Sequence, residues 1–245
     1  MLTTTMLPLF QPELSRQISS CGIVAVLILD RANDAVPVAR SLVAGGVTAM
    51  ELTTLRTPVA LDALEAIRAE VPDMIAGVGT ILTPDQVKLA KKSGAQFGVA
   101  PGTNPKVLAA AREASLSFAP GVATPSDIET ALEYQCELFK FFPAEPCGGL
   151  SYLNTIAAPY LHLGIKFVPL GGLNAANMAS YLADSKIAAI GGSWLAPRDF
   201  VKSGSWREIT ELASITLLSI FLLRCEFFCK MRRRGVGRPT LATQH

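Results

Sequence analysis

The chain has 245 residues and a mass of 26.0 kDa, half of its residues are hydrophobic, and its formal net charge is +2. A chain of this length and apolar content can bury one large core, and α/β barrels often fill such a length as a single domain. The basic excess is concentrated in the KMRRRGVGR segment at 230–238, so no basic face indicates nucleic acid as a partner.

Eight short apolar runs alternate with amphipathic stretches along the chain. The runs are rich in Val, Ile, Phe or Ala and end near Gly, Pro or Thr, as buried parallel strands do; they occupy residues 22–29, 47–52, 74–80, 95–101, 116–122, 137–142, 165–172 and 187–194. Helical patterns lie between them at 33–46, 57–70, 83–95, 103–115, 124–135 and 174–185. Several of these begin with Thr-Pro or Asn, which suit the N-cap and the first helical turn.

This alternation predicts an α/β protein with a (β/α)8 TIM-barrel fold in one domain. An open doubly wound sheet is the alternative, but the GVGT segment at 77–80 lacks the full dinucleotide fingerprint. We divide the chain into an N-terminal segment with a short helix at 1–21, the barrel at 22–213, and an atypical extension at 214–245.

The extension is apolar at first and basic at its end. The uncharged run between Glu211 and Arg224 has twelve residues, which is shorter than the ~20 that span a bilayer, so we expect no membrane anchor. We expect the apolar part to extend the last helix and the basic end to be a disordered, solvated tail. Cys225 and Cys229 have no nearby histidine and make a poor metal site.

Cysteine usage and the N-terminus bear on the compartment. The five cysteines are odd in number and scattered, without the spacing of a disulfide framework. Residues 1–17 have no basic n-region, no sustained apolar h-region and no small-residue cleavage pattern, so they do not predict a signal peptide. We therefore expect a cytoplasmic protein.

A lysine in the aromatic run ELFKFF at 137–142 is the first candidate for chemistry. Strand alternation places Leu138 and Lys140 on one face and Phe139 and Phe141 on the other. One interpretation is that Lys140 extends its ammonium to water along apolar neighbours. The other is that the apolar setting favours a neutral amine that attacks a carbonyl, forming a Schiff base.

The carboxyl ends of the strands carry few polar side chains, and catalytic groups of barrels lie at these ends. Glu51 ends the second strand and shares an inward face with Ala49, so it can shuttle protons for Lys140. The alternative for Glu51 is an ion pair that merely neutralises the lysine, which is costly to bury. Only two histidines exist and neither ends a strand, so we expect neither a metal nor another cofactor.

Two glycine pairs end the seventh and eighth strands, Gly171-Gly172 and Gly191-Gly192, the latter followed by Ser193. Backbone amides at these positions commonly bind phosphate in barrels, although tight turns use such pairs equally often. Arg56 follows the second strand, where its planar fork can bind a carboxylate or simply be solvated.

Seven collinear motifs over about residues 12–213 resemble the bacterial 2-keto-3-deoxy-6-phosphogluconate and 4-hydroxy-2-oxoglutarate aldolases, a class I aldolase family. The motifs are VAGGVTAMELTTLRTP, GVGTILTPDQ, GAQFGVAPG, FAPGVATPSD, FKFFPAE, FVPLGGLN and IGGSWLAP. The resemblance implies a homotrimeric barrel that cleaves a phosphorylated keto-deoxy sugar acid to pyruvate and glyceraldehyde 3-phosphate in the Entner–Doudoroff pathway of carbohydrate metabolism.

The resemblance also implies roles for individual residues. Lys140 matches the Schiff-base lysine and Glu51 matches the proton-transferring glutamate. The remaining matches are Arg56 and Thr80 around the pyruvyl carboxylate, Pro101 and Phe142 as pocket walls, and Gly171, Gly172, Gly192 and Ser193 in the phosphate site.

Three departures from the family pattern concern function. ELTTLRT contains one more threonine than the usual E-V-T-L-R-T, and an insertion in a strand reverses side-chain direction unless a bulge absorbs it, which affects Arg56. Leu170 replaces the usual threonine before Gly171, removing a hydroxyl from the phosphate end. Residues 214–245 have no counterpart in the family.

Three functional alternatives remain open at this stage. The chain can be a 2-keto-3-deoxy-6-phosphogalactonate aldolase, or it can prefer the shorter 4-hydroxy-2-oxoglutarate. A phosphate-binding barrel enzyme that forms no covalent intermediate is a second alternative. The third is a scaffold or membrane-attached barrel without catalytic activity.

Overall fold

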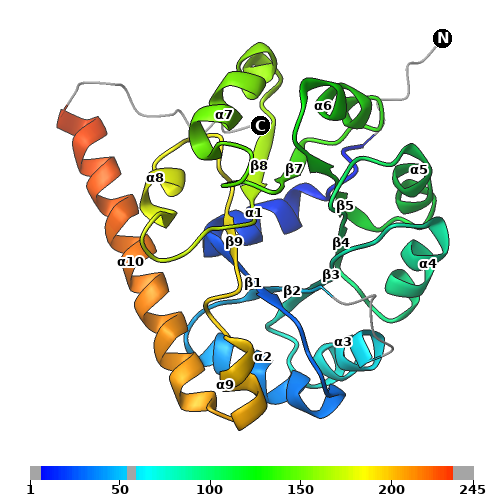
Figure 1. Cartoon of the computed structure of the whole chain (residues 1–245), viewed down its shortest axis with the longest axis vertical. Helices are drawn as coiled ribbons and strands as arrows, with labels where there is room; N and C mark the ends of the chain where they lie inside the picture. The colour runs from blue at the N-terminus through cyan, green and yellow to red at the C-terminus, as the bar shows by residue number, and fades with distance from the viewer. Residues whose placement is uncertain (1–6, 54–58, 234–245) are drawn as a thin grey trace, which may run out of the picture.

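The computed structural model describes residues 7–53 and 59–233, with the side chains described as far as Cys225. Parallel strands alternate with helices along most of the chain; the helices lie around the outside of the strands, except α1, which lies across the interior (Figure 1). The strands are β1 (Ile23–Leu27), β2 (Ala49–Leu52), β3 (Ile75–Val78), β4 (Phe97–Val99), β5 (Ser117–Ala119), β6 (Gly121–Val122), β7 (Leu138–Phe141), β8 (Lys166–Pro169) and β9 (Ile190–Gly192).

The strands form two parallel sheets with the orders β5-β4-β3-β2-β1-β9 and β6-β7-β8. The run predicted as one strand at 116–122 is divided into β5 and β6, because Pro120 has no N–H to donate to a ladder. The chain itself connects the sheets through Pro120, whose O accepts the Lys140 amide (2.8 Å), and at the other edge the Ala188 amide, just before β9, donates to Phe167 O in β8 (2.9 Å). The result is an α/β fold with a curled parallel sheet.

The helices that follow the strands are the predicted ones together with α7, α9 and the 3-10 turns. Their bounds are α1 (Pro12–Cys21), η1 (Ala32–Asp34), α2 (Ala35–Ala44), α3 (Val59–Glu70), α4 (Pro84–Lys92), α5 (Pro105–Glu113), α6 (Pro125–Leu132), α7 (Gly149–Ala157), η2 (Ala158–Leu163), α8 (Met178–Leu182), α9 (Arg198–Ser203) and α10 (Trp206–Arg233).

Local sequence explains where several of these helices begin. The Thr83 and Thr124 side chains accept the amides of Gln86 and Asp127 in reciprocal capping boxes, and a proline occupies the first turn of each helix. Asn104 caps the start of α5 in a similar way: its side-chain oxygen accepts the Lys106 amide at 3.0 Å. The Thr-Pro signals therefore predicted the starts of α4 and α6 correctly, whereas Asn33 and Asn174, which begin two other predicted helices, do not cap them: α2 begins after Asp34 and α8 after Asn177.

Apolar side chains fill two layers, one between strands and helices and one inside the curl of the strands. The inner cluster includes Ala49, Leu138 and Val168, and α1 contributes Leu14 and Ile18 to it. The segment before α1 is tied to the starting ends of strands, since the Leu9 amide donates to Gln135 O and the Gln11 amide to Ser117 Oγ. The helix α1 thus closes the interior at the end opposite to the carboxyl ends.

The last helix, α10, runs without a break through the boundary expected between residues 213 and 214. The apolar part of the extension therefore continues a helix, as its sequence predicts. The basic end, which we predict to be a disordered tail, lies largely beyond residue 233 and therefore outside the described residues. No helix in the described ranges is long and apolar enough to cross a membrane.

Candidate active site

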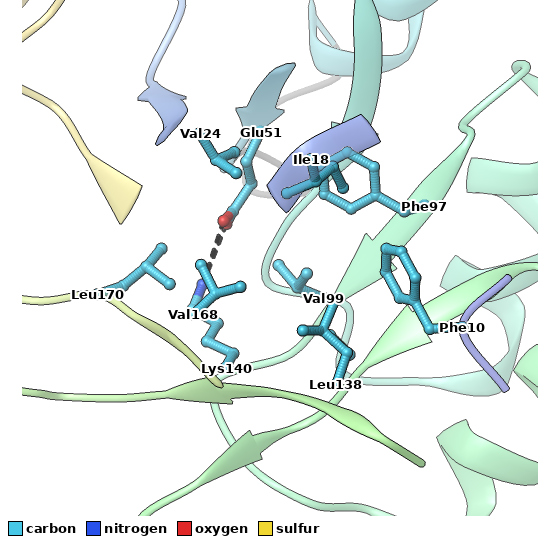
Figure 2. A pocket seen from close by; sticks show the side chains of 11 residues that line it. Phe10, Ile18, Val24, Glu51, Phe97, Val99, Leu138, Lys140, Val168 and Leu170 are labelled. Carbon is cyan, nitrogen blue, oxygen red and sulfur yellow. Dashed lines mark hydrogen bonds and ion pairs between the residues drawn. The ribbon is translucent and has the colours of Figure 1, made fainter. Parts of the chain in front are cut away.

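Lys140 and Glu51 face each other across the interior, one from β7 and the other from β2 (Figure 2). The Lys140 Nζ lies 3.1 Å from Glu51 Oε1 and 3.4 Å from Oε2. Both residues are buried, with 6% of Lys140 and 2% of Glu51 exposed. Burial excludes the interpretation in which the ammonium extends to bulk water.

The surroundings of this pair are almost entirely apolar. A small cavity adjoins it, and its lining includes Phe10, Ile18, Val99, Val168 and Leu170 (Figure 2). Phe142 also lies beside the lysine, with its ring centroid 5.4 Å from Nζ. A buried charge pair in such a setting is expensive to desolvate and is a marker of functional sites.

Strand alternation brings Lys140 to this position. Leu138 lies with Lys140 on the inner face, while Phe139 and Phe141 point toward the helices. Phe139 packs against Phe167 with ring centroids 5.5 Å apart, and Phe141 stacks on Tyr152 at 6.4 Å. The packing of Phe139 and Phe141 on the helix side therefore holds β7 in the position that presents Lys140 to the interior.

Gly79 makes room for the Glu51 carboxylate. It follows β3 directly, and its amide donates to Leu52 O (2.8 Å) beside Glu51. A methyl group on Gly79 would lie 1.8 Å from Glu51 Oε1 and 2.7 Å from Cδ. Sequence reasoning missed this residue, although its place at a strand end next to the end carrying Glu51 is a signal that points to it.

Thr80 stands at the same edge in an unusual backbone conformation. Its φ is 59°, a region that costs a threonine free energy and that recurs at active sites. Its hydroxyl lies 3.5 Å from Thr53 O.

The predicted carboxylate ligand Arg56 lies outside the described residues. Pro101 is exposed and follows the end of β4. Its backbone lies so close to Gly121 that a methyl group on Gly121 would collide with the Pro101 carbonyl.

The Gly171-Gly172 pair forms a tight loop after β8. Both glycines have positive φ, at 96° and 88°, which favours glycine. Gly172 O accepts bonds from the Asn174 and Asn177 side-chain amides at 3.3 Å and 3.1 Å. Within the ranges that the structure covers, the main-chain amides of both glycines have no acceptor, so they are available to an anion.

Glu145 supports this loop from behind. Its amide donates to Gly171 O at 3.0 Å, and a methyl on Gly172 would lie 2.6 Å from its Cβ. The hydroxyl of buried Tyr181 donates to Glu145 Oε1. Burial and the neighbouring carboxylate raise the pKa of Tyr181, so this hydroxyl keeps its proton. The Glu145–Tyr181 contact was not evident from the sequence.

The second glycine pair ends β9 beside β1, and Ser193 after it is exposed. A methyl group on Gly192 would lie 1.7 Å from the Trp194 ring, and one on Gly191 would lie 2.4 Å from Leu170. Both glycines therefore admit close packing at the end of the strand. The described residues contain no group of three or more side chains suited to hold a metal ion.

Comparison with known proteins gives a consistent result. The family model "Aldolase: KDPG and KHG aldolase" matches residues 14–212. A 2-dehydro-3-deoxy-phosphogluconate aldolase of Treponema pallidum is 42% identical over 195 residues, covering 80% of this chain and 91% of that protein. A KHG/KDPG aldolase of Escherichia coli is 43% identical over 191 residues, covering 78% and 88%.

Solved structures are similar over the same region. The KDPG aldolase of Legionella pneumophila, with pyruvate captured at low pH as a covalent carbinolamine intermediate, is 35% identical with a TM-score of 0.78, covering 82% of this chain and 97% of that one. The 2-keto-3-deoxy-6-phosphogluconate aldolase of Zymomonas mobilis with 3-phosphoglycerate is 35% identical with a TM-score of 0.74, covering 82% and 95%.

Proposed function

Because the chain belongs to the KDPG and KHG aldolase family, we propose that it is a class I aldolase, a lyase that cleaves 2-keto-3-deoxy-6-phosphogluconate to pyruvate and glyceraldehyde 3-phosphate. The observation that carries this proposal is the buried contact of 3.1 Å between Lys140 Nζ and Glu51 Oε1. An amine and one carboxylate are sufficient for Schiff-base chemistry, which needs no metal or other cofactor.

Lys140 is the nucleophile in this mechanism. Its ammonium passes a proton to Glu51, and the free amine attacks the C2 ketone of the substrate, forming a carbinolamine. Glu51, now protonated, donates that proton to the C2 hydroxyl, which leaves as water. The product of this first half is an iminium between Lys140 and C2.

Glu51 is the base in the second half. It takes the proton of the C4 hydroxyl, the C3–C4 bond breaks, and the electron pair of that bond moves toward the iminium nitrogen. Glyceraldehyde 3-phosphate leaves, and an enamine of pyruvate remains on Lys140. Protonation at C3 followed by hydrolysis of the imine releases pyruvate and restores the amine.

The remaining site residues bind the substrate in this proposal. The amides after β8 and β9, from Gly171, Gly172, Gly192 and Ser193, hold the phosphate. Thr80 and Arg56 are assigned to binding of the pyruvyl carboxylate, and Pro101 and Phe142 are assigned as pocket walls. The positive φ of both loop glycines and the ring of Phe142 next to Nζ support these assignments.

A second substrate is favoured by Leu170. Its side chain is buried in the inner apolar cluster and stands at the position where the family pattern has a hydroxyl before the glycine pair. An apolar group there suits the shorter, unphosphorylated 4-hydroxy-2-oxoglutarate, which would give pyruvate and glyoxylate. A 2-keto-3-deoxy-6-phosphogalactonate aldolase remains the alternative within phosphorylated substrates. Steady-state kcat/KM values for the three compounds rank them.

Architecture and assembly belong to the same proposal. We infer that the two sheets form one closed (β/α)8 barrel over 22–213 as a single domain, and that three such chains assemble into a homotrimer. The continuous chain from β5 to β6 and the bond from the Ala188 amide to Phe167 O support the closure. Cys21, Cys136, Cys147 and Cys225 are free thiols, which supports a cytoplasmic location.

Borohydride trapping tests the covalent step. Incubating the protein with pyruvate and borohydride should reduce the imine and attach a pyruvate-derived group to Lys140, which peptide mass spectrometry locates. A barrel enzyme without a covalent intermediate gives no adduct. An adduct on another lysine, or none, would reject Lys140 as the nucleophile.

Gly79→Ala tests whether the space beside Glu51 matters. The added methyl displaces the carboxylate, and a displacement of about 1 Å commonly costs roughly 100-fold in rate. We expect kcat to fall by about that factor while KM changes little, because Glu51 acts on reacting atoms rather than on binding.

Gly102→Ala is the matched control, since a methyl there meets nothing within 4 Å and the backbone is not in the left-handed region. It should leave kcat and the melting temperature near their original values. An unchanged kcat for Gly79→Ala, with both proteins folded, would show that Glu51 does not need its present position.

A further inference from the structure

The helix α10 presents an exposed apolar stripe that the aldolase fold does not explain. Four large side chains on it are more than half exposed: Ile215 (64%), Leu218 (60%), Phe221 (63%) and Leu222 (53%). They recur at helical spacing on one side. All four lie beyond residue 212, where the match to the aldolase family ends.

The opposite side of α10 is firmly packed, which fixes the direction of the stripe. Ala213, Thr216 and Ile220 are buried there. The Arg224 guanidinium donates to the carbonyls of Ser20 and Ser19 at 2.8 Å and 2.6 Å, joining α10 to the end of α1. The helix runs along the outside of the molecule, so its free face points away from the barrel (Figure 1).

The sequence that follows the stripe is strongly basic. From residue 224 onward it carries one acidic residue, Glu226, against six basic ones, namely Arg224, Lys230, Arg232, Arg233, Arg234 and Arg238. The stripe itself is free of charge, because no charged residue lies between Glu211 and Arg224. An apolar helix face next to a cluster of positive charge is typical of segments that lie on anionic lipid surfaces.

We propose that α10 attaches the protein reversibly to the surface of an anionic membrane, with Ile215, Leu218, Phe221 and Leu222 inserted among the acyl chains. The helix lies in the plane of the interface, since the uncharged run is too short to span a bilayer. The basic sequence supplies the electrostatic half of the attraction. Neither half is sufficient alone, because stable attachment takes two such signals.

A second copy of this chain suits the stripe less well. Four side chains are few compared with the roughly 20–30 residues that each partner contributes to a stable protein interface. A parallel pairing would also bring two basic segments together, and like charges at short distance repel. The lipid surface, by contrast, complements both the apolar face and the charge.

Vesicle flotation of the full chain tests this proposal. The protein should float with vesicles of phosphatidylcholine mixed with phosphatidylglycerol, but not with phosphatidylcholine alone. Raising the salt from about 0.1 M to about 0.5 M should weaken binding, because it screens the basic segment. Absence of flotation with the anionic vesicles would overturn the proposal.

Two variants separate the apolar and electrostatic contributions. Leu218→Glu with Phe221→Glu should weaken binding by roughly 100-fold or more, since two inserted side chains become charged. Arg232→Gln with Arg233→Gln and Arg234→Gln should weaken it by about 100-fold, given roughly fivefold for each basic residue. Both variants should keep aldolase activity, which shows that they fold.

Leu89→Glu is the control, because Leu89 is 46% exposed on α4, away from α10. It should bind vesicles like the unaltered protein. Flotation that survives Leu218→Glu with Phe221→Glu would contradict the role of the stripe. Analytical ultracentrifugation adds a further check: self-association abolished by the same variant would assign the stripe to a second copy instead.

Discussion

Replacing Lys140 with methionine is expected to lower kcat/KM for 2-keto-3-deoxy-6-phosphogluconate by roughly 10⁵-fold or more, the scale on which enzymes lose activity with their covalent nucleophile. Methionine keeps most of the volume of the lysine stem but has no amine. The apolar side chains beside the lysine stem, which include Val168 and Leu170, therefore keep their packing, while the imine cannot form. Pyruvate release measures the loss, and borohydride with pyruvate should leave this variant unlabelled.

Lys91→Met is the matched control for a lysine on the surface, where its Nζ donates to Ser115 O at 2.8 Å. It should retain full activity and full labelling by pyruvate. Circular dichroism of both variants shows whether the fold persists. A Lys140→Met protein that still releases pyruvate at a substantial fraction of the original rate would contradict the covalent mechanism.

Glu51→Gln is expected to lower kcat by about 10²- to 10⁴-fold, the range that general acid–base groups contribute. The amide keeps the shape of the carboxylate in the space left by Gly79 but cannot accept the proton of the C4 hydroxyl. It also leaves the Lys140 ammonium without a counterion among apolar side chains. We therefore expect slower imine formation and a lower melting temperature, since removing one partner of a buried pair costs about 3–5 kcal/mol.

Glu70→Gln provides the comparison, because Glu70 forms an exposed ion pair with Arg40 at 2.9 Å. Exposed pairs contribute about 1 kcal/mol or less, so this variant should be nearly unchanged in stability and activity. If Glu51→Gln lowered the melting temperature but kept full activity, Glu51 would be a neutralising partner of Lys140 rather than a proton carrier. Single-turnover measurements with pyruvate and borohydride separate imine formation from bond cleavage.

Much of the fold could be predicted from local patterns. The alternation of apolar runs and amphipathic stretches predicted the order of strands and helices, and capping residues such as Thr83 and Thr124 predicted where helices begin. The period of two in ELFKFF assigned Lys140 and Phe139 to opposite faces. These features depend on neighbours within a few residues along the chain, which is why the sequence alone predicts them.

Other features arise only when distant segments meet. Lys140 and Glu51 are 89 positions apart, and their contact depends on how β2 and β7 curve round one interior. The need for glycine at position 79 follows from the path of the Glu51 carboxylate, which no local pattern encodes. Pro120 marks the division of strand five locally, but the pairing of β5 with β4 and of β6 with β7 depends on distant segments.

The identity of the residues was sufficient to indicate an amine, a carboxylate and two glycine-rich strand ends, because each type of chemistry needs particular side chains. Their distances, their burial and the direction of the apolar face of α10 were decided by packing across the molecule. An apolar run such as SITLLSIFLL has the same sequence whether it is buried or exposed; only the position of α2, α8 and α1 beside it determines which side remains free.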